Sequence, residues 1–300
     1  MRVAITGSSG LIGTALRASL TRDGHEVTRL VRRPVSGRAG FVTWDPATGR
    51  IDGKGLEGHD AVVHLAGESL AGLWTPARKR EIVGSRVKGT TLLCETLASL
   101  ERPPRVLVSS SAVGYYGARA PQEAVTEAAA PGTGFLAETA VQWETATAAA
   151  VKAGIRTVLV RTALVLSMEG GPLSLMLPPF RLGLGGPLGS GDQPWPWIAL
   201  EDVVHAIRFV IDHADIEGPV NFAAPEAVTN AEFTKALATA LGRPAGFRVP
   251  AFVMRLAPGG MADEMLLTGA RVAPAKLLES GYTFRQPALL PALRSMLPSG

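Results

Sequence analysis

The chain of 300 residues contains a single cysteine, Cys94, few aromatic residues and little charge. One cysteine cannot form an intrachain disulfide, and it excludes a zinc site built from several cysteines. Hydrophobic residues make up 46% of the chain and charged residues only 19%, which excludes a disordered, charge-dominated segment. These absences indicate a globular protein without a metal site. We expect it in a reducing compartment, the cytoplasm.

Long apolar runs and clusters of positive charge are also missing. No uncharged apolar stretch reaches the roughly 18 residues needed to span a bilayer, and no leader precedes the strand expected from Arg2. The net charge is +4, yet the Lys and Arg residues are scattered rather than gathered in runs. We therefore expect no membrane and no nucleic acid as partner, but a small-molecule substrate. The sequence leaves the oligomeric state open.

Short runs rich in Val, Ile and Leu alternate with helix-like stretches in the first half of the chain. The expected strands cover residues 2–6, 26–31, 40–44, 61–65, 105–109 and 156–160, and the expected helices cover 11–23, 78–100 and 135–153. This alternation is typical of βαβ units, and strands apolar on both faces are typical of a parallel sheet. The sequence predicts an α/β protein with a doubly wound, Rossmann-type sheet.

Glycine and proline become frequent after residue 166 and are expected to interrupt regular structure. We expect a lid over residues 166–197, in which Trp195 and Trp197 can form an aromatic wall or Trp197 can be a buried anchor. A helix over 200–213, a strand over 218–222 and a capped helix after Thr229 are expected to follow. The predicted domains are residues 1–165, to which 200–225 return, and a smaller, loop-rich substrate-side lobe, 166–300.

A glycine-rich loop connects the first expected strand to the first expected helix. It runs from Thr6 to Gly13 with the spacing T-G-x-x-G-x-x-G. Small residues permit a tight turn, the approach of a pyrophosphate to backbone N–H groups and close packing of helix on strand. Its place within a βαβ unit predicts dinucleotide binding rather than a turn without a ligand. The expected cofactor contacts are Gly7, Ser9, Gly10, Leu11, Ile12 and Gly13.

The end of the second expected strand indicates which dinucleotide binds. An acidic residue there would bind the ribose hydroxyls of NAD and repel the extra phosphate of NADP. The chain has no such acid and continues with Arg32 and Arg33. Guanidinium groups form charge-assisted hydrogen bonds with phosphate. We therefore predict NADP(H) as the cofactor, the alternative being that both arginines are ordinary exposed side chains.

Further motifs give the chain a family resemblance. They lie at residues 64–67, 86–90, 109–117, 179–187, 189–191, 196–198, 229–233 and 277–284. With the glycine loop, the first three resemble the extended short-chain dehydrogenase/reductases. The later ones look like an atypical branch of the NAD-dependent epimerases/dehydratases, the epimerase family proteins, also labelled cell-division-inhibitor-like. The resemblance covers essentially the whole chain and implies ancestry, but it names no substrate.

The resemblance also implies cofactor contacts beyond the glycine loop. These are Leu65, Ala66, Gly67, Glu68, Glu81, Arg86, Ser109 and Arg161. Glu68 follows the Leu-Ala-Gly turn and can touch the nicotinamide side. Arg86 stands where epimerase relatives carry Asn, and it can either reach the cofactor phosphates or pair with Glu81 on the same helix.

In that superfamily a Tyr-x-x-x-Lys pair performs the proton chemistry. The chain lacks this pair, because Phe135 falls near the Tyr position and Thr139 near the Lys position. Another titratable group must then lie within hydrogen-bond reach of the substrate. The candidates are Ser111, Tyr116 and Glu138.

Each candidate also has a simpler interpretation. Ser111 can be a hydroxyl at the end of a strand, Tyr116 a wall of the pocket and Glu138 a carboxylate on a helix surface. His64 ends a buried strand, where a histidine is more often a packing or hydrogen-bonding residue than a general base.

Two functions follow. The first is an NADP(H)-dependent oxidoreductase or epimerase-like enzyme with an unusual proton donor, which the lid and the expected pocket favour. The second is a nonenzymatic module that binds NADP(H) and reports redox state to a protein partner, which the missing Tyr-Lys pair favours. The sequence favours the enzyme.

Overall fold

The structure is a computed structural model, and it describes residues 1–33, 39–256 and 259–297. Its centre is one sheet of eight strands in the order β11-β8-β6-β5-β1-β2-β3-β4. The strands are β1 (Arg2–Thr6), β2 (Glu26–Val31), β3 (Phe41–Asp45), β4 (Arg50–Ile51), β5 (Ala61–His64), β6 (Val106–Ala112), β8 (Arg156–Thr162) and β11 (Gly218–Phe222). Only β4 pairs in the antiparallel sense. The predicted doubly wound, Rossmann-type sheet is confirmed.

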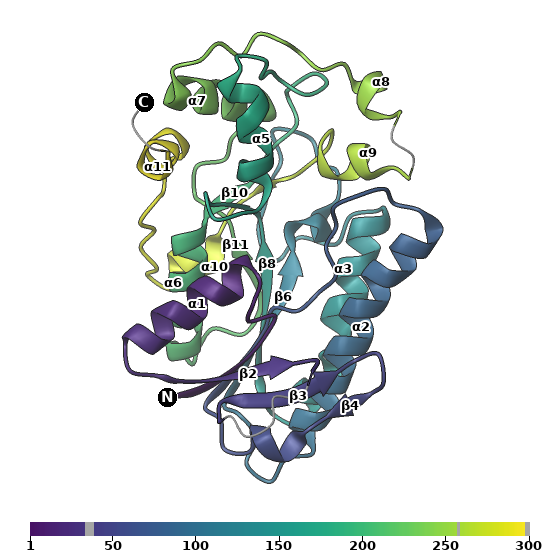
Figure 1. Cartoon of the computed structure of the whole chain (residues 1–300), viewed down its shortest axis with the longest axis vertical. Coiled ribbons are helices and arrows are strands. Elements are labelled where there is room, and N and C mark those ends of the chain that lie inside the picture. Colours follow the sequence, from purple (N-terminus) through teal and green to yellow (C-terminus); the bar gives the residue numbers. More distant parts are fainter. Residues whose placement is uncertain (34–38, 257–258, 298–300) are drawn as a thin grey trace.

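Helices cover both faces of this sheet (Figure 1). One face packs against α1 (Leu11–Arg22) and α6 (Leu200–Asp212) through a core that includes Val3, Ile5 and Leu16. The other packs against α2 (Pro76–Ala98), α3 (Phe135–Thr145) and α4 (Ala148–Lys152) through a core that includes Ala4 and Val62. Strands buried on both faces explain the continuous apolar runs in the sequence. Because the strands are parallel, their carboxyl ends lie at the same edge of the sheet. The candidate site lies at this edge.

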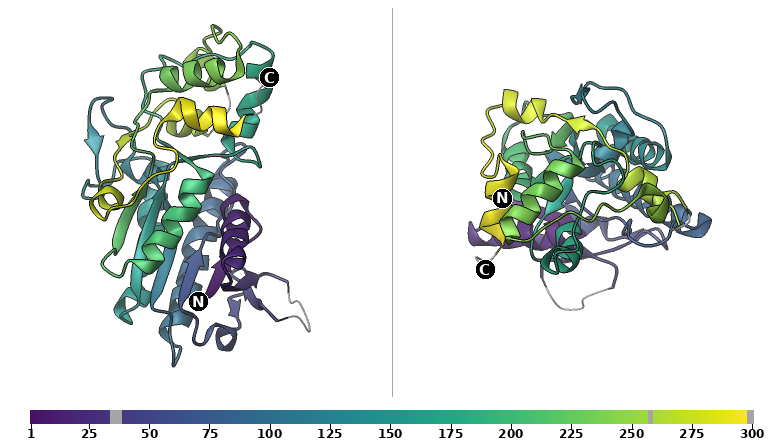
Figure 2. Two further views of the ribbon diagram at one scale, coloured as in Figure 1. Left: turned by 90° about the vertical axis from the view of Figure 1, so that its left-hand side faces the viewer. Right: turned by 90° about the horizontal axis from the view of Figure 1, so that it is seen from above.

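A second group of helices stands above that edge (Figure 2). It includes α5 (Pro172–Arg181), α7 (Asn230–Leu241), α8 (Ala251–Met254), α9 (Met261–Met265) and α11 (Leu289–Met296). Helices α5, α7 and α11 share a separate core that contains Trp195, Phe233 and Leu293. Helix α7 begins as expected, because Thr229 and Glu232 form a capping box.

Further short elements lie between the main strands and helices. They are the 3-10 helices η1 (Gly53–Leu56) and η2 (Val113–Tyr116), the strand pairs β9 (Leu164–Leu166) with β10 (Trp197–Ala199) and β7 (Ala124–Val125) with β12 (Arg271–Val272), and helix α10 (Ala275–Glu279). Within the described ranges, no helix is both long enough and apolar enough to cross a membrane.

Two expected elements differ in the structure. The helix expected over 135–153 is divided into α3 and α4, which are separated by residues 146–147. The segment after residue 166 was expected to lack regular structure, but it contains helix α5. Pro172 occupies the first turn of α5, where a missing N–H costs nothing, although Pro178 and Pro179 lie inside the helix.

Candidate functional site

The glycine loop is closely packed on one side and open on the other. Gly7 has a φ of +63°, and a Cβ there would lie 2.8 Å from the carbonyl carbon of Leu65. A Cβ on Gly13 would lie 2.2 Å from the Gly7 carbonyl oxygen, so the loop and α1 can meet only through glycine. A Cβ on Gly10, by contrast, would have one neighbour within 4 Å, the Gly7 oxygen at 3.4 Å. The open side of the loop is therefore at Gly10.

The N-terminus of α1 is free to bind an anion at that open side. Gly10 is its N-cap and makes no side-chain cap, and the first turn contains no acidic residue. The Gly10 N–H donates to the Gly7 oxygen at 3.0 Å, while no side chain of the described residues caps the first turn, where the positive end of the helix dipole lies. Ser9 and Gly10 are exposed, while Gly13 is buried. The loop fits a pyrophosphate, as the sequence predicts.

Arg32 and Arg33 directly follow β2, at the same edge of the sheet as the glycine loop. Both side chains belong to exposed residues. Arg29, which was not a candidate, donates from Nε to the Ser8 hydroxyl at 3.1 Å and connects β2 to the glycine loop. Arg29 thus contacts the loop, and Arg32 and Arg33 follow it at the end of the same strand, which suits an anionic group there.

Behind the glycine loop, His64 holds the ends of β1 and β5 together. The Thr6 hydroxyl accepts hydrogen bonds from the Leu65 and Ala66 N–H groups and lies 2.7 Å from His64 Nδ1. Thr6 must therefore donate its proton to Nδ1, so that Nε2 carries the hydrogen and donates to Thr90 at 2.9 Å. Complete burial lowers the pKa of His64 to about 4. His64 is a neutral hydrogen-bonding residue, as expected.

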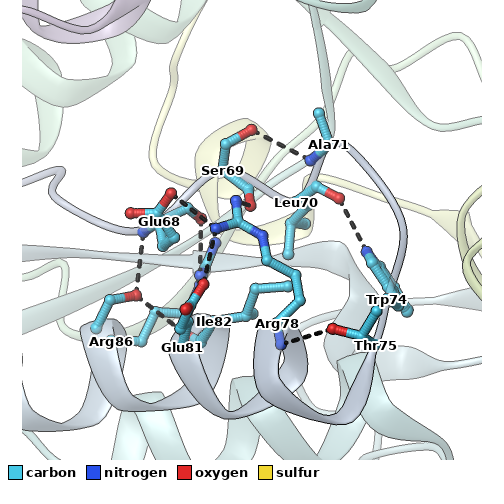
Figure 3. A network of polar contacts seen from close by, with 11 residues as sticks. Glu68, Ser69, Leu70, Ala71, Trp74, Thr75, Arg78, Glu81, Ile82 and Arg86 are labelled. Carbon is cyan, nitrogen blue, oxygen red and sulfur yellow. Dashed lines mark hydrogen bonds and ion pairs between the residues drawn. The ribbon is translucent and has the colours of Figure 1, made fainter. Parts of the chain in front are cut away.

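The loop after β5 forms one wall of the site and is fixed to α2 (Figure 3). Arg78 forms ion pairs with Glu68 at 3.0 Å and Glu81 at 3.2 Å, and it donates to the Ser69 carbonyl oxygen. The alternative in which Glu81 pairs with Arg86 is wrong, because Glu81 lies one turn away, beside Arg78. The Glu68 carboxylate is likewise held by Arg78, so its role is to position the loop.

Arg86 is buried and faces the site from α2. Its Nη1 donates to the backbone oxygens of Glu68 and Ile82 at 3.0 and 3.1 Å, and its guanidinium lies over the Trp143 ring. Among the described residues, no carboxylate forms an ion pair with it. Burial lowers the pKa of Arg86 to about 10. A buried cation without a counterion indicates a place for an anionic ligand group.

A cavity of about 1190 Å³ extends from Arg86 into the space between the sheet edge and the upper helices. Its floor includes Ala112 to Gly114 after β6 and Thr162 to Leu164 after β8. Its roof comes from α5, α7 and the segment 184–188, so residues expected to form a lid do line it. Trp195 is in the lining, whereas Trp197 is fully buried and donates to the Glu226 carbonyl oxygen. Of the two tryptophans, Trp195 therefore forms the aromatic wall and Trp197 is the anchor.

The expected catalytic Ser111 and Tyr116 belong to a buried polar network instead. The Ser111 hydroxyl donates to Glu144 at 2.7 Å, and the Tyr116 hydroxyl donates to Asn221 at 2.6 Å. Tyr116 is 0% exposed, and burial raises its pKa. Neither side chain lines the cavity. Both hydroxyls take the partners that the protein interior supplies, so the structure does not bring either candidate into the described lining of the cavity.

Arg161 is the centre of this network and is not available to the cofactor as expected. Its Nε and Nη2 bind both Glu144 oxygens at 2.8 and 2.9 Å, and Nη1 donates to the Tyr116 hydroxyl at 3.0 Å. Burial opposes the charge, but the bonds to Glu144 and Tyr116 raise the pKa of Arg161 above its usual value. The Ser109 side chain is also inside the sheet, fully buried, and its hydroxyl has no partner among the described residues.

Helix α3 presents an apolar face to the cavity. Leu136, Thr139, Ala140 and Trp143 line it, one or more per turn. Glu138 is exposed on another side of the helix, so its expected contact with a substrate is wrong. Phe135 also lies outside the lining and packs against Trp74. Helix α3 itself contains neither Tyr nor Lys.

Sequence reasoning did not find Trp143, Thr90, Glu144 and Asn221, which complete these two networks. Thr90 accepts hydrogen bonds from both His64 and Trp143. An available signal was the spacing of Arg86 and Thr90, which places both on the buried side of α2. The partners on α3 and β11 are 17 to 105 residues away in sequence and gave no local signal.

The fold and the glycine loop define a Rossmann-type protein of the short-chain dehydrogenase/reductase class. The NAD dependent epimerase/dehydratase family model matches residues 3–223, and a domain of unknown function, DUF1731, matches residues 249–296. The chain belongs to the NAD dependent epimerase/dehydratase family, and its resemblance to the epimerase family proteins is confirmed.

Three relatives describe this kinship. Epimerase family protein Mb2239 of Mycobacterium bovis is 44% identical over 292 residues, 97% of this chain and 96% of that protein. Human epimerase family protein SDR39U1 is 37% identical over 300 residues, 99% of this chain and 100% of that protein. The crystal structure of human SDR39U1 (isoform2) with NADPH is similar, with a TM-score of 0.88, 35% identity and 99% of each chain covered.

Proposed function

We propose that this protein is an NADP(H)-dependent oxidoreductase or epimerase-like enzyme that acts on a small molecule in the cavity between the sheet edge and the upper helices. The observation that carries the proposal is the buried Arg86 guanidinium, which has no carboxylate partner among the described residues and faces that cavity. A buried cation is costly unless a ligand supplies the opposite charge. The buried Cys94 thiol supports a reducing, cytoplasmic location.

Several features support NADP(H) as the dinucleotide. The open N-terminus of α1 at Gly10 suits the pyrophosphate, and Arg86 is available for an oxygen farther along the same edge. Arg32 and Arg33 follow β2 with no acidic residue in their place, which suits a 2′-phosphate. The related human SDR39U1 was crystallised with NADPH, which supports the same choice here.

NADPH, when bound, would supply a hydride to the substrate. The residues of the chain bind and orient the reactants: the glycine loop and Arg86 hold anionic groups, and Trp143 and Leu136 exclude water from the floor. The described lining contains no Tyr, Lys, His or Cys side chain. We therefore propose that the proton is exchanged with water rather than with Ser111, Tyr116 or Glu138.

The same lining supports a second candidate, a nonenzymatic NADP(H)-binding protein that reports redox state. General acid catalysis contributes about 10² to 10⁴-fold. The carboxyl groups of the described lining, Asp263 and Glu264, are engaged by Arg255 and by the N–H groups of Phe135 and Leu136, so the site gains little of this factor. The two candidates make the same prediction for cofactor binding and opposite predictions for turnover.

Cofactor titration and turnover test the proposal in one series. Purified protein is titrated with NADPH and NADH by nicotinamide fluorescence, and molecules that copurify are identified by mass spectrometry. We expect saturable binding with preference for NADPH and slow, substrate-dependent oxidation of NADPH. Absence of binding rejects both candidates, whereas binding without oxidation for any copurified molecule or carbonyl compound favours the reporter.

A further inference from the structure

We propose that the substrate is an uncharged molecule with a large apolar body and one carbonyl or hydroxyl group, rather than a sugar nucleotide. This inference deepens the proposed function and rests on it. It follows from which side chains line the cavity, which charges they carry and which of their polar groups are already bonded.

Most of the wall surface beyond Arg86 is apolar. They include Leu136 of α3, Met176 and Phe180 of α5, Phe233 of α7, Met265 of α9 and Trp195. A volume of about 1190 Å³ lies above the usual range of ligand pockets, which is roughly 300–1,000 Å³. The space therefore accepts a bulky organic molecule in addition to the nicotinamide end of a cofactor.

Charges in the described lining disfavour an anionic substrate. Arg86 is its only cation and lies at the floor, beside the loop after β5. On the roof side, Glu264 accepts hydrogen bonds from the N–H groups of Phe135 and Leu136, at 3.0 and 2.7 Å, and caps α3. Asp263 pairs with Arg255 at 2.8 Å. A diphosphate would meet two fixed carboxylates and no second guanidinium, although such groups are bound mainly by Arg and Lys.

Three hydroxyl groups of the lining are already donated to the protein backbone. Thr139 donates to the Phe135 oxygen at 2.6 Å, Ser174 to the Gly171 oxygen at 2.7 Å and Thr268 to the Asp263 oxygen at 2.7 Å. Asn230 uses its amide oxygen to accept from the Leu188 N–H. The hydroxyl groups of a sugar ring would lose several hydrogen bonds to water on entering this cavity and would regain few from the protein. Sugar hydroxyls left without a partner would strongly weaken binding.

The outer rim of the cavity is apolar as well. Leu175 of α5 is 75% exposed and Leu184 is 55% exposed, and both line the cavity. Phe247, adjacent to the lining through its contact with Gly186, is 62% exposed. Apolar side chains exposed together at a mouth favour the capture of an apolar ligand from water.

The test compares two ligands on full-length protein saturated with NADPH. Isothermal titration calorimetry measures binding of 2-acetylnaphthalene, an uncharged aromatic ketone, and of UDP-glucose, and absorbance at the reduced nicotinamide band follows oxidation. We expect the ketone to bind at least about 100-fold more tightly than UDP-glucose. Equal or tighter binding of UDP-glucose, or no binding of the ketone, would overturn the proposal.

Matched variants connect the binding to this cavity. Leu175 and Leu182 are both 75% exposed, but only Leu175 lines the cavity. We expect Leu175→Asp to weaken ketone binding by about tenfold and Leu182→Asp to leave it unchanged. Equal effects of the two variants would assign the binding to the general surface and overturn the proposal.

The same titrations separate this inference from the proposed function. Ketone binding without oxidation of NADPH supports the ligand class and contradicts the enzyme. Reduction of NADP⁺ by UDP-glucose in the NADP⁺-loaded protein, together with no oxidation of NADPH by the ketone, supports the enzyme and contradicts the ligand class.

Discussion

The Arg86 guanidinium lies over the Trp143 ring, with 4.9 Å between the Arg86 Cζ atom and the ring centroid. Trp143 is in turn held by its Nε1–H, which donates to Thr90 at 3.0 Å. One side of the cation is therefore covered by an aromatic face and the other is directed to the cavity. The protein positions this charge without neutralising it. We therefore expect Arg86 to contribute more to the affinity for an anionic ligand than to the free energy of unfolding.

Replacement of Arg86 is expected to weaken cofactor binding while sparing the fold. In Arg86→Met, loss of a charged hydrogen-bond donor, worth about 1.5–3 kcal/mol, lowers NADPH affinity by roughly 10- to 100-fold. The free energy of unfolding of the cofactor-free protein changes by less than about 1 kcal/mol, because the loss of the bonds to the Glu68 and Ile82 oxygens is offset by the removal of a buried charge. Fluorescence titration and urea unfolding measure the two effects. Arg80→Met, at an exposed position of α2, serves as the control.

Cofactor preference depends on the arginines after β2. Arg32→Ala is expected to reduce affinity for NADPH by about tenfold or more and to leave affinity for NADH unchanged, because only NADPH carries the 2′-phosphate. Arg33→Ala acts in the same direction. Parallel titrations with NADPH and NADH measure these effects, and the exposed Arg22→Ala serves as the control. If the double variant Arg32→Ala/Arg33→Ala still preferred NADPH, the assignment would be contradicted.

Two glycines of the loop respond differently to alanine. Gly13→Ala forces a Cβ to 2.2 Å from the Gly7 oxygen, so the free energy of unfolding falls by about 1–3 kcal/mol. Gly10→Ala has ordinary backbone angles and open space, so the fold persists, but the added methyl group obstructs the approach of a pyrophosphate. Thermal unfolding and NADPH titration of both variants distinguish these effects. Full NADPH affinity in Gly10→Ala would place the ligand elsewhere.

The buried His64 makes stability depend on pH. Its pKa is about 4 in the folded protein and 6.5 in the unfolded chain, so the unfolded state binds the proton first as pH falls. The His64 contribution is therefore fully present above pH 6.5 and is lost progressively down to about pH 4, by roughly 3 kcal/mol. Urea unfolding between these pH values measures the slope. His64→Gln, which can accept from Thr6 and donate to Thr90, should flatten it.

Tyr116 is expected to contribute to stability and not to catalysis. Tyr116→Phe removes the donor to Asn221 and an acceptor for Arg161, at a cost of about 1–3 kcal/mol in the free energy of unfolding. NADPH affinity and any turnover number should stay within about twofold of the native values, since the hydroxyl does not reach the cavity. Tyr115→Phe is the control. A loss of turnover without loss of stability would restore Tyr116 as a proton donor.

The sheet and the glycine loop could be predicted from the sequence because their signals are local. Apolar runs, and the spacing of Gly7, Gly10 and Gly13, depend only on residues within one element. The bounds of β1, β2 and β11 accordingly agree with those expected. The glycine positions lie where the prediction put them, although their contact with a cofactor stays a prediction.

The candidate catalytic residues could not be placed in the same way. Whether Ser111 and Tyr116 face a cavity or the interior depends on Glu144 and Asn221, which are 33 and 105 residues away. The sequence left the role of Arg86 open for a similar reason. Whether a carboxylate lies beside its guanidinium depends on the three-dimensional structure and not on the neighbouring residues in the chain. Glycine and proline also misled the prediction for α5, since proline in the first turn starts a helix rather than interrupting it.

The cap that Glu264 places on α3 affects how ligands enter and leave. The Glu264 carboxylate belongs to the upper helices and accepts hydrogen bonds from two N–H groups at the start of α3. These bonds hold the two sides of the cavity together. A movement of the upper helices away from the sheet edge would break this cap each time a ligand enters or leaves, at a cost of about 0.5–2 kcal/mol. A ligand can enter and leave more easily through the rim at Leu175 and Leu184, where only apolar side chains must move. The residence time of a ligand is then set by side-chain rearrangement and not by domain motion.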